Sequence, residues 1–142
     1  MTVKQISVFL ENRQGRLARL CTTLADQGID MLAISIADTT DYGILRIYVS
    51  DHEKAAGILR DAGFSVSITD VIAVAVDDAP GGLAGILRIL ADEDISVGYL
   101  YSLVRRVGHK AVLLLQFRDI ESAVQVLRQH EVHMLSGEEI TG

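Results

Sequence analysis

Apolar residues recur along the chain with two alternating periods, and these periods predict its helices and strands. In residues 5–10 the apolar residues Ile6, Val8 and Leu10 alternate with other positions, as in a strand with one buried face. A spacing of three and four residues follows over 17–24, which is the spacing of one helix face. The same two patterns continue to the C-terminal end. They predict strands over 5–10, 31–37, 43–49, 64–69, 71–76, 97–104, 111–117 and 133–136, and helix faces over 17–24, 55–62, 83–90 and 123–127.

The chain contains the same unit twice. Residues 15–29 recur as residues 81–95 at a constant offset of 66, and the later offset is 68, from Leu45 and Leu113 onward. Each copy has the order βαββαβ. This order predicts an α+β fold of two ferredoxin-like βαββαβ units in tandem, with antiparallel sheets and both helices on one face. We place the first domain in residues 1–70 and the second in residues 71–142, joined at Asp70 without a linker.

In one predicted strand, apolar and polar residues do not alternate. Residues 111–115 are apolar without interruption, which is typical of a strand buried on both faces. The face opposite the helices is therefore expected to pack against something, and a second copy of the chain is the simplest candidate, giving a homodimer. The alternative is that a small domain tolerates an exposed leucine or two. We expect 31–37 and 97–104 to be edge strands.

Charge and composition exclude several classes of partner. Thirteen basic and nineteen acidic residues give the 142-residue chain a net charge of −6, and acidic residues outnumber basic ones in both halves. Nucleic acid and anionic membranes favour clustered Lys and Arg, so neither is expected as a partner. The single cysteine, Cys21, excludes an intrachain disulfide. Because the N-terminal residues lack an apolar signal stretch, a cytoplasmic protein is expected.

The loop between the first strand and the first helix contains residues suited to binding a small molecule. Gly15 at the start of the helix lets several backbone N–H groups point toward one place, where the helix dipole favours a carboxylate. Asn12 and Asp30 would then recognise the two ends of an amino-acid backbone. The alternative is structural: Asn12 and Asp78 cap their helices, and Gly15 only supplies an unusual dihedral angle.

The same loops carry a family resemblance over the whole chain. Glu11-Asn12-Arg13-Gln14-Gly15-Arg16-Leu17 precedes a helix that closes with Gly28-Ile29-Asp30-Met31, and Asp77-Asp78-Ala79-Pro80-Gly81-Gly82-Leu83 is the second copy. Both runs resemble the ligand loop of ACT domains. The chain is similar to small stand-alone proteins made of two tandem ACT domains. That resemblance implies allosteric regulation by a free amino acid or similar metabolite bound at an ACT–ACT interface, with no cofactor and with a metabolic enzyme or transporter as a further partner.

The resemblance also implies the site residues. The family's loop Asn and Gly fall on Asn12 and Gly15, and its corner Asn falls on Asp30. Gln14 stands where the family usually has Pro, and Asp78 and Ser96 take the two positions in the second copy. Tyr99 is added because it shares a strand face with Tyr101 and offers a ring for stacking. The predicted ligand residues are Asn12, Arg13, Gln14, Gly15, Arg16, Leu17, Asp30, Met31, Asp78, Ala79, Pro80, Gly81, Gly82, Leu83, Ser96 and Tyr99.

The second loop differs from the first in charge. Asp77 and Asp78 place negative charge where a ligand carboxylate would lie, and Pro80 fits the first turn of the following helix. If this loop binds ligand, Asp78 is expected to meet an amino group.

Catalysis has little support in the sequence, which contains no nucleophile elbow and no Gly-rich phosphate loop with Lys. An acylphosphatase-like hydrolase using Arg13 and Asn12 is a remote alternative, and His130 with His133 and Glu131 permits a weak metal hypothesis. The main rival is a protein–protein interaction module that binds no ligand and acts as a regulatory subunit of an enzyme.

Overall fold

The computed structural model describes residues 1–11, 13–38 and 41–141, without the side chain of Asp38. Tertiary contacts divide the chain into two compact units, Lys4–Thr69 and Met1–Val3 with the residues from Asp70 onward. We call them the first-copy unit and the second-copy unit. The elements are β1 Val3–Glu11, α1 Arg16–Asp26, β2 Met31–Asp38, β3 Tyr42–Val49, α2 His52–Asp61, β4 Ser65–Asp77, α3 Gly82–Asp92, β5 Val97–Ser102, β6 Lys110–Phe117, α4 Ile120–Gln129, β7 Met134–Leu135 and α5 Gly137–Thr141.

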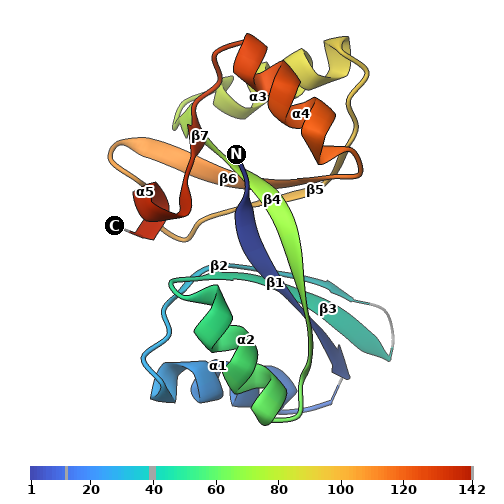
Figure 1. Ribbon diagram of the computed structural model, residues 1–142, viewed down its shortest axis with the longest axis vertical. Helices are drawn as coiled ribbons and strands as arrows, with labels where there is room; N and C mark the ends of the chain where they lie inside the picture. Colours follow the sequence, from blue (N-terminus) through green and yellow to red (C-terminus); the bar gives the residue numbers. More distant parts are fainter. Residues whose placement is uncertain (12, 39–40, 142) are drawn as a thin grey trace. The chain divides into compact units, whose positions relative to one another are not determined.

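In the first-copy unit, strand β3 lies between β2 and β1, and both pairings are antiparallel. Helices α1 and α2 lie together against one face of these strands (Figure 1). Ile6, Val8, Leu45 and Ile47 point toward the helices and are fully buried with Leu20 of α1. The predicted alternation in β1 is therefore confirmed, because the apolar side chains of one strand face form the core. Strand β2 lies at the predicted edge.

The second-copy unit repeats this plan. Strand β6 lies between β4 and β5, β7 pairs with β4, and α3 and α4 lie together over one face (Figure 1). The core contains Ile72, Leu90, Leu115 and Leu127. The ferredoxin-like βαββαβ fold class is confirmed for both copies. No helix in the described part of the chain is both long and apolar enough to cross a membrane.

Three elements differ from the sequence prediction. The expected strands over 64–69 and 71–76 form one continuous strand, β4, with no break at Asp70. Strand β5 ends at Ser102 rather than at residue 104, because Val104 lies in the following loop and is exposed. Helix α5 was not predicted. Its signal is a capping box, in which the Ser136 N–H donates to Glu139 Oε1 at 3.1 Å and the Glu139 N–H donates to Ser136 Oγ at 3.3 Å.

The uninterrupted apolar segment of β6 is buried on both faces, as predicted. Leu113 and Leu115 belong to the core beneath the helices, while Val112 and Leu114 on the other face are 1% and 0% exposed. The homodimer that this pattern suggested stays a prediction.

Candidate functional site

The first-copy loop, residues 11–16, enters α1 through a tight turn. The Arg16 N–H donates to the carbonyl oxygen of Arg13 at 3.2 Å, and Gly15 has φ +85° and ψ −7°. These angles at the third turn residue are those of a type II turn, which requires positive φ and favours glycine there. Gly15 is also the N-cap of α1, so the unusual dihedral predicted for it is confirmed. Asn12 lies outside the described residues.

The second-copy loop, residues 77–82, has the same turn. The Gly82 N–H donates to the carbonyl oxygen of Ala79 at 3.1 Å, and Gly81 is the N-cap of α3 with φ +91°. Pro80 therefore lies one residue before the N-cap, and its prediction in the first helical turn is wrong. The prediction that Asp78 caps the helix is also wrong, because a glycine holds that position and no side chain does so. The turn, which occupies residues 79–82, places the N-cap three residues beyond Asp78.

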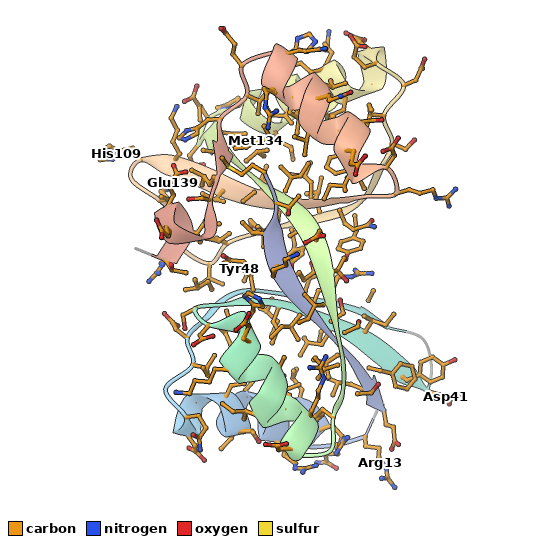
Figure 2. All side chains as sticks on the ribbon, in the orientation of Figure 1. Arg13, Asp41, Tyr48, His109, Met134 and Glu139 are labelled. Atoms are coloured by element: carbon orange, nitrogen blue, oxygen red, sulfur yellow. The ribbon has the colours of Figure 1, made fainter. Side chains whose placement is uncertain are left out.

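A small cleft of about 160 Å³ opens beside the first-copy loop, and we call it the first-copy cleft. Three charged residues line it, Glu11, Arg13 and Arg16, and the remaining lining residues are Leu10, Leu17, Ile36 and Gly43. Arg13 lies 3.4 Å from Glu11 and is directed outward from its unit (Figure 2). Arg16 is held at the cleft by its guanidinium, which lies 4.8 Å from the ring centre of Phe64.

In the second-copy loop the acidic side chains already have cationic partners. Asp77 pairs with Lys110, and Asp78 pairs with Arg106. Arg106 lies in the hairpin loop between β5 and β6, and Lys110 is the first residue of β6. This loop is longer than its counterpart in the first copy. Sequence reasoning located this hairpin but missed its role, because nothing in the local pattern indicates which carboxylate a distant cation will meet.

The two loops also differ in how closely they pack. A Cβ at Gly82 would overlap the carbonyl oxygen of Asp77, whereas the equivalent residue of the first copy is Arg16, which has a side chain. Gly81 and Gly82 line a separate hollow of about 340 Å³ together with His130, His133 and Lys110. Each histidine lies near a carboxylate: His130 Nε2 is 3.8 Å from Glu93 Oε1, and His133 Nε2 is 3.4 Å from Glu139 Oε2. Among the described residues no group of three or more His, Cys, Asp or Glu could hold a metal ion.

The corner after α1 lies away from the first-copy loop. Asp30 follows the C-terminal end of α1 and the loop precedes its N-terminal end, and an 11-residue helix is about 16 Å long. Within one unit, therefore, Asp30 and the loop residues do not meet around a single amino acid. The Asp30 N–H donates to Ser50 Oγ at 3.3 Å, and Met31 packs partly against the core.

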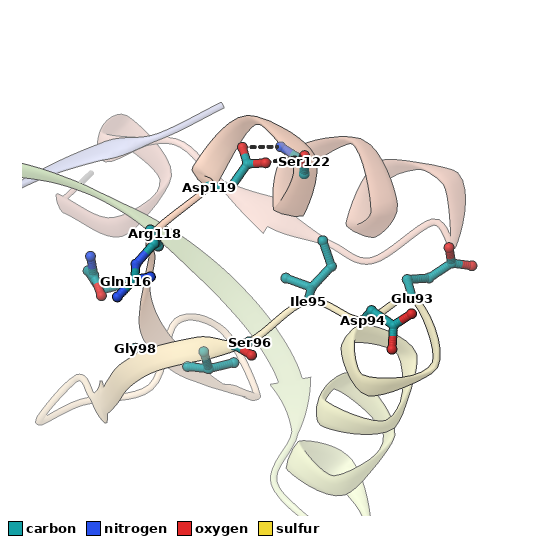
Figure 3. Close-up of a pocket in the computed structure, with 10 residues that line it drawn as sticks. Glu93, Asp94, Ile95, Ser96, Gly98, Gln116, Arg118, Asp119 and Ser122 are labelled. Carbon is teal, nitrogen blue, oxygen red and sulfur yellow. Dashed lines mark hydrogen bonds between the residues drawn. The ribbon is translucent and has the colours of Figure 1, made fainter.

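The corresponding corner of the second copy holds a larger recess of about 830 Å³, which we call the corner recess (Figure 3). Ser96 is the one predicted ligand residue among those that line it. The side chain of Asp119, at the start of α4, accepts from the N–H of Ser122 at 3.2 Å and from its hydroxyl at 2.6 Å. These hydrogen bonds lower the pKa of the Asp119 carboxyl.

The remaining predicted site residues that the structure describes fall outside these three hollows. Tyr99 and Tyr101 share a strand face as predicted, and their rings are stacked with centroids 6.5 Å apart. Leu83 packs partly against the core of the second-copy unit. Of the sixteen predicted residues, the hollows bring together Arg13, Arg16 and Leu17 in one unit and Gly81 with Gly82 in the other, while Ser96 lies alone in the corner recess.

The fold, the repeated turns and the two-unit plan agree with one family model, the ACT domain pair, which matches residues 1–142. The chain belongs to the ACT domain pair family. Among solved structures, protein BT0572 from Bacteroides thetaiotaomicron is 35% identical, with a TM-score of 0.91, and the match covers 99% of this chain and 96% of that one. None of the curated proteins matches.

More distant structures share the fold of this ACT domain pair. The regulatory subunit of aspartate kinase from Thermus thermophilus, in its ligand-free form, is 14% identical with a TM-score of 0.60, and the match covers 89% of this chain and 90% of that one. A structure of aspartokinase alpha and beta subunits is 19% identical with a TM-score of 0.51, covering 90% of this chain and 95% of that one.

Proposed function

We propose that this ACT domain pair is a non-catalytic regulatory protein that binds a free amino acid with an apolar side chain in the first-copy cleft. The observation that carries the proposal is the charge arrangement there. Two arginines and one carboxylate line the cleft together with apolar side chains, at the N-terminal end of α1. Each charged group suits one part of an amino acid.

The ligand carboxylate would lie against Arg13 and Arg16, where the first N–H groups of α1 have no intrahelical acceptor. The ligand ammonium would face Glu11, and the apolar side chain would contact Leu17 and Ile36. The second-copy loop is less suited to a carboxylate because Asp77 and Asp78 pair with both of its cations. In the first-copy loop Arg13 pairs with Glu11, but Arg16 lies against the ring of Phe64.

Regulation of an enzyme is the role that the comparisons support for such a ligand. The regulatory subunit of aspartate kinase from Thermus thermophilus has the same fold over nine-tenths of its own length. By analogy, the present chain would transmit ligand binding to a separate metabolic enzyme or transporter in the cytoplasm, with no cofactor of its own.

A ligand-free interaction module is the second candidate, and exposed apolar side chains favour it. Phe9 and Tyr42 form a ring pair with centroids 4.7 Å apart, and Ile44 lies beside Phe9 on the adjacent strand. These side chains are 41% to 46% exposed. Such a patch is a candidate surface for a partner enzyme or for the second chain of a homodimer.

A thermal-shift panel of free amino acids separates the two candidates. A ligand at a hundredfold excess over its dissociation constant would add about 2.7 kcal/mol to the free energy of unfolding. We expect apolar amino acids to raise the melting temperature and charged ones not to do so. If no amino acid raises the melting temperature and calorimetry detects no binding, the interaction module is the better account.

A further inference from the structure

Phe64 holds two arginines of α1 in the first-copy unit. Its side chain, which directly precedes β4, is 4% exposed and belongs to the core. The guanidinium carbons of Arg16 and Arg19 lie 4.8 Å and 5.1 Å from the centre of its ring. Arg19 is also fixed by a hydrogen bond, since its Nη2 donates to the carbonyl oxygen of Ala62 at 2.8 Å. We call Arg16, Arg19 and Phe64 the aromatic clamp.

Arg16 is the member of the clamp with an unused donor. Its Nε is buried and has no hydrogen-bond partner within the described part of the chain. A buried N–H without an acceptor costs free energy, and the attraction between the guanidinium and the ring offsets part of that cost. A ring face does not compete with a carboxylate for hydrogen bonds in the way that an acid or a carbonyl group does. The terminal N–H groups of Arg16 therefore remain available at the first-copy cleft, which this residue lines.

The second copy lacks all three members of the clamp. The positions that correspond through the repeat are Arg16 and Gly82, Arg19 and Gly85, and Phe64 and Val132. The backbone agrees with the last match, because the N–H groups of Phe64 and Val132 both donate at 2.9 Å to the carbonyl oxygen five residues earlier. Gly82 and Val132 line the hollow of about 340 Å³. Where the first copy has a stacked cation, the second copy thus has open space.

We propose that Phe64 is a positioning residue for the first-copy cleft, where its ring fixes the Arg16 guanidinium at the place that the ligand carboxylate occupies. The inference rests on the proposed function for the identity of the ligand. An arginine side chain that moves freely loses rotamer freedom when it binds an anion. A guanidinium that the ring already holds loses less, so it binds a carboxylate more tightly. Arg19 on the same ring adds positive potential near that carboxylate.

The first part of the test is isothermal calorimetry on the full chain with L-valine, L-leucine and L-isoleucine. For the amino acid that binds most tightly, Phe64→Leu should weaken binding by about three- to tenfold, because it removes the ring and keeps apolar bulk. Phe64→Tyr keeps a ring and should restore most of the affinity. Phe117→Leu is the matched control, since Phe117 is also 4% exposed and lies in the core of the second-copy unit. It should leave the affinity unchanged.

The second part follows the Nε–Hε signal of Arg16 by NMR, which reports on more than a loss of stability. In the ligand-free chain the ring should shift this proton upfield. The shift should be lost in Phe64→Leu and kept in both Phe64→Tyr and Phe117→Leu. Titration with acetate, which offers a carboxylate alone, should move the same signal and should need about three- to tenfold more acetate in Phe64→Leu.

The outcomes separate this inference from the proposed function. Equal affinity of the wild type and Phe64→Leu for the amino acid or for acetate would overturn the positioning role, and so would an equal loss in Phe117→Leu. If none of the three amino acids binds but acetate moves the Arg16 signal in a way that depends on Phe64, the proposed function fails and the positioning role stands. If no probe moves that signal, both are overturned.

Discussion

Gly82 is the residue at which the two loops differ most in backbone packing. The overlap of an added Cβ with the carbonyl oxygen of Asp77 leads us to expect that Gly82→Ala lowers the free energy of unfolding by about 1–3 kcal/mol. Gly85→Ala is the matched control, because Gly85 lies in the same helix with open space around its Cβ position. That control should gain about 0.5–1 kcal/mol. Urea denaturation of both variants measures the difference, and equal effects would contradict the close approach.

Some residues of the site follow from local rules and others do not. The positive φ of Gly15 and the cap at Asp51, whose carboxylate accepts from the Lys54 N–H, were predictable because both depend on neighbours in sequence. Pro80 was misplaced because it lies in a turn, residues 79–82, that leads into α3. The pairing of Asp78 with Arg106 depends on a contact between distant segments, which hydrophobic periodicity does not encode.

At the scale of elements, the type II turns explain the proline of the second loop. Proline fits the second position of such a turn, and Gln14 takes that position in the first copy. We expect Gln14→Pro to stabilise the chain by about 0.4–1 kcal/mol, because proline restricts the unfolded state. The reverse change, Pro80→Gln, should destabilise it by a similar amount. Chemical denaturation would contradict the assignment if Gln14→Pro destabilised the chain.

The stability of helix α4 is expected to depend on pH through its N-cap residue, Asp119. Hydrogen bonds from Ser122 lower the pKa of Asp119 below its ordinary value of 3.8. The cap is therefore fully effective above that pH, and its contribution is lost as the pH falls through the lowered pKa. Asp119→Asn should remove this part of the acid dependence and lower the melting temperature at neutral pH. Unfolding curves that keep the same pH dependence below 3.8 in both proteins would contradict the role of the cap.

Helices and strands were easiest to predict where only one of their faces is buried. The alternation in β1 and the helical spacing in α1 reflect a single buried face, so the sequence pattern and the structure agree. The short helix α5 was missed because five residues are too few for a periodic signal. Its capping box at Ser136 and Glu139 was nevertheless readable in the sequence.

For the whole molecule, the duplication supplies two related scaffolds whose hollows lie in different places. The first copy keeps a cleft beside the loop before α1, and the second copy opens a recess at the corner after α3. Sequence comparison of the copies predicted an asymmetry at these positions. It did not predict which hollows form, because cavity shape depends on packing between segments distant in sequence.

The central claim is that the first-copy cleft binds an apolar amino acid, and isothermal calorimetry on matched variants tests it most directly. Arg13→Gln and Arg106→Gln each remove an exposed arginine that pairs with a carboxylate, one beside each loop. With the amino acid that gives the largest thermal shift, the account predicts that Arg13→Gln weakens binding by about tenfold or more while Arg106→Gln leaves it unchanged. Equal affinity in the wild type and Arg13→Gln, or a loss confined to Arg106→Gln, would contradict it.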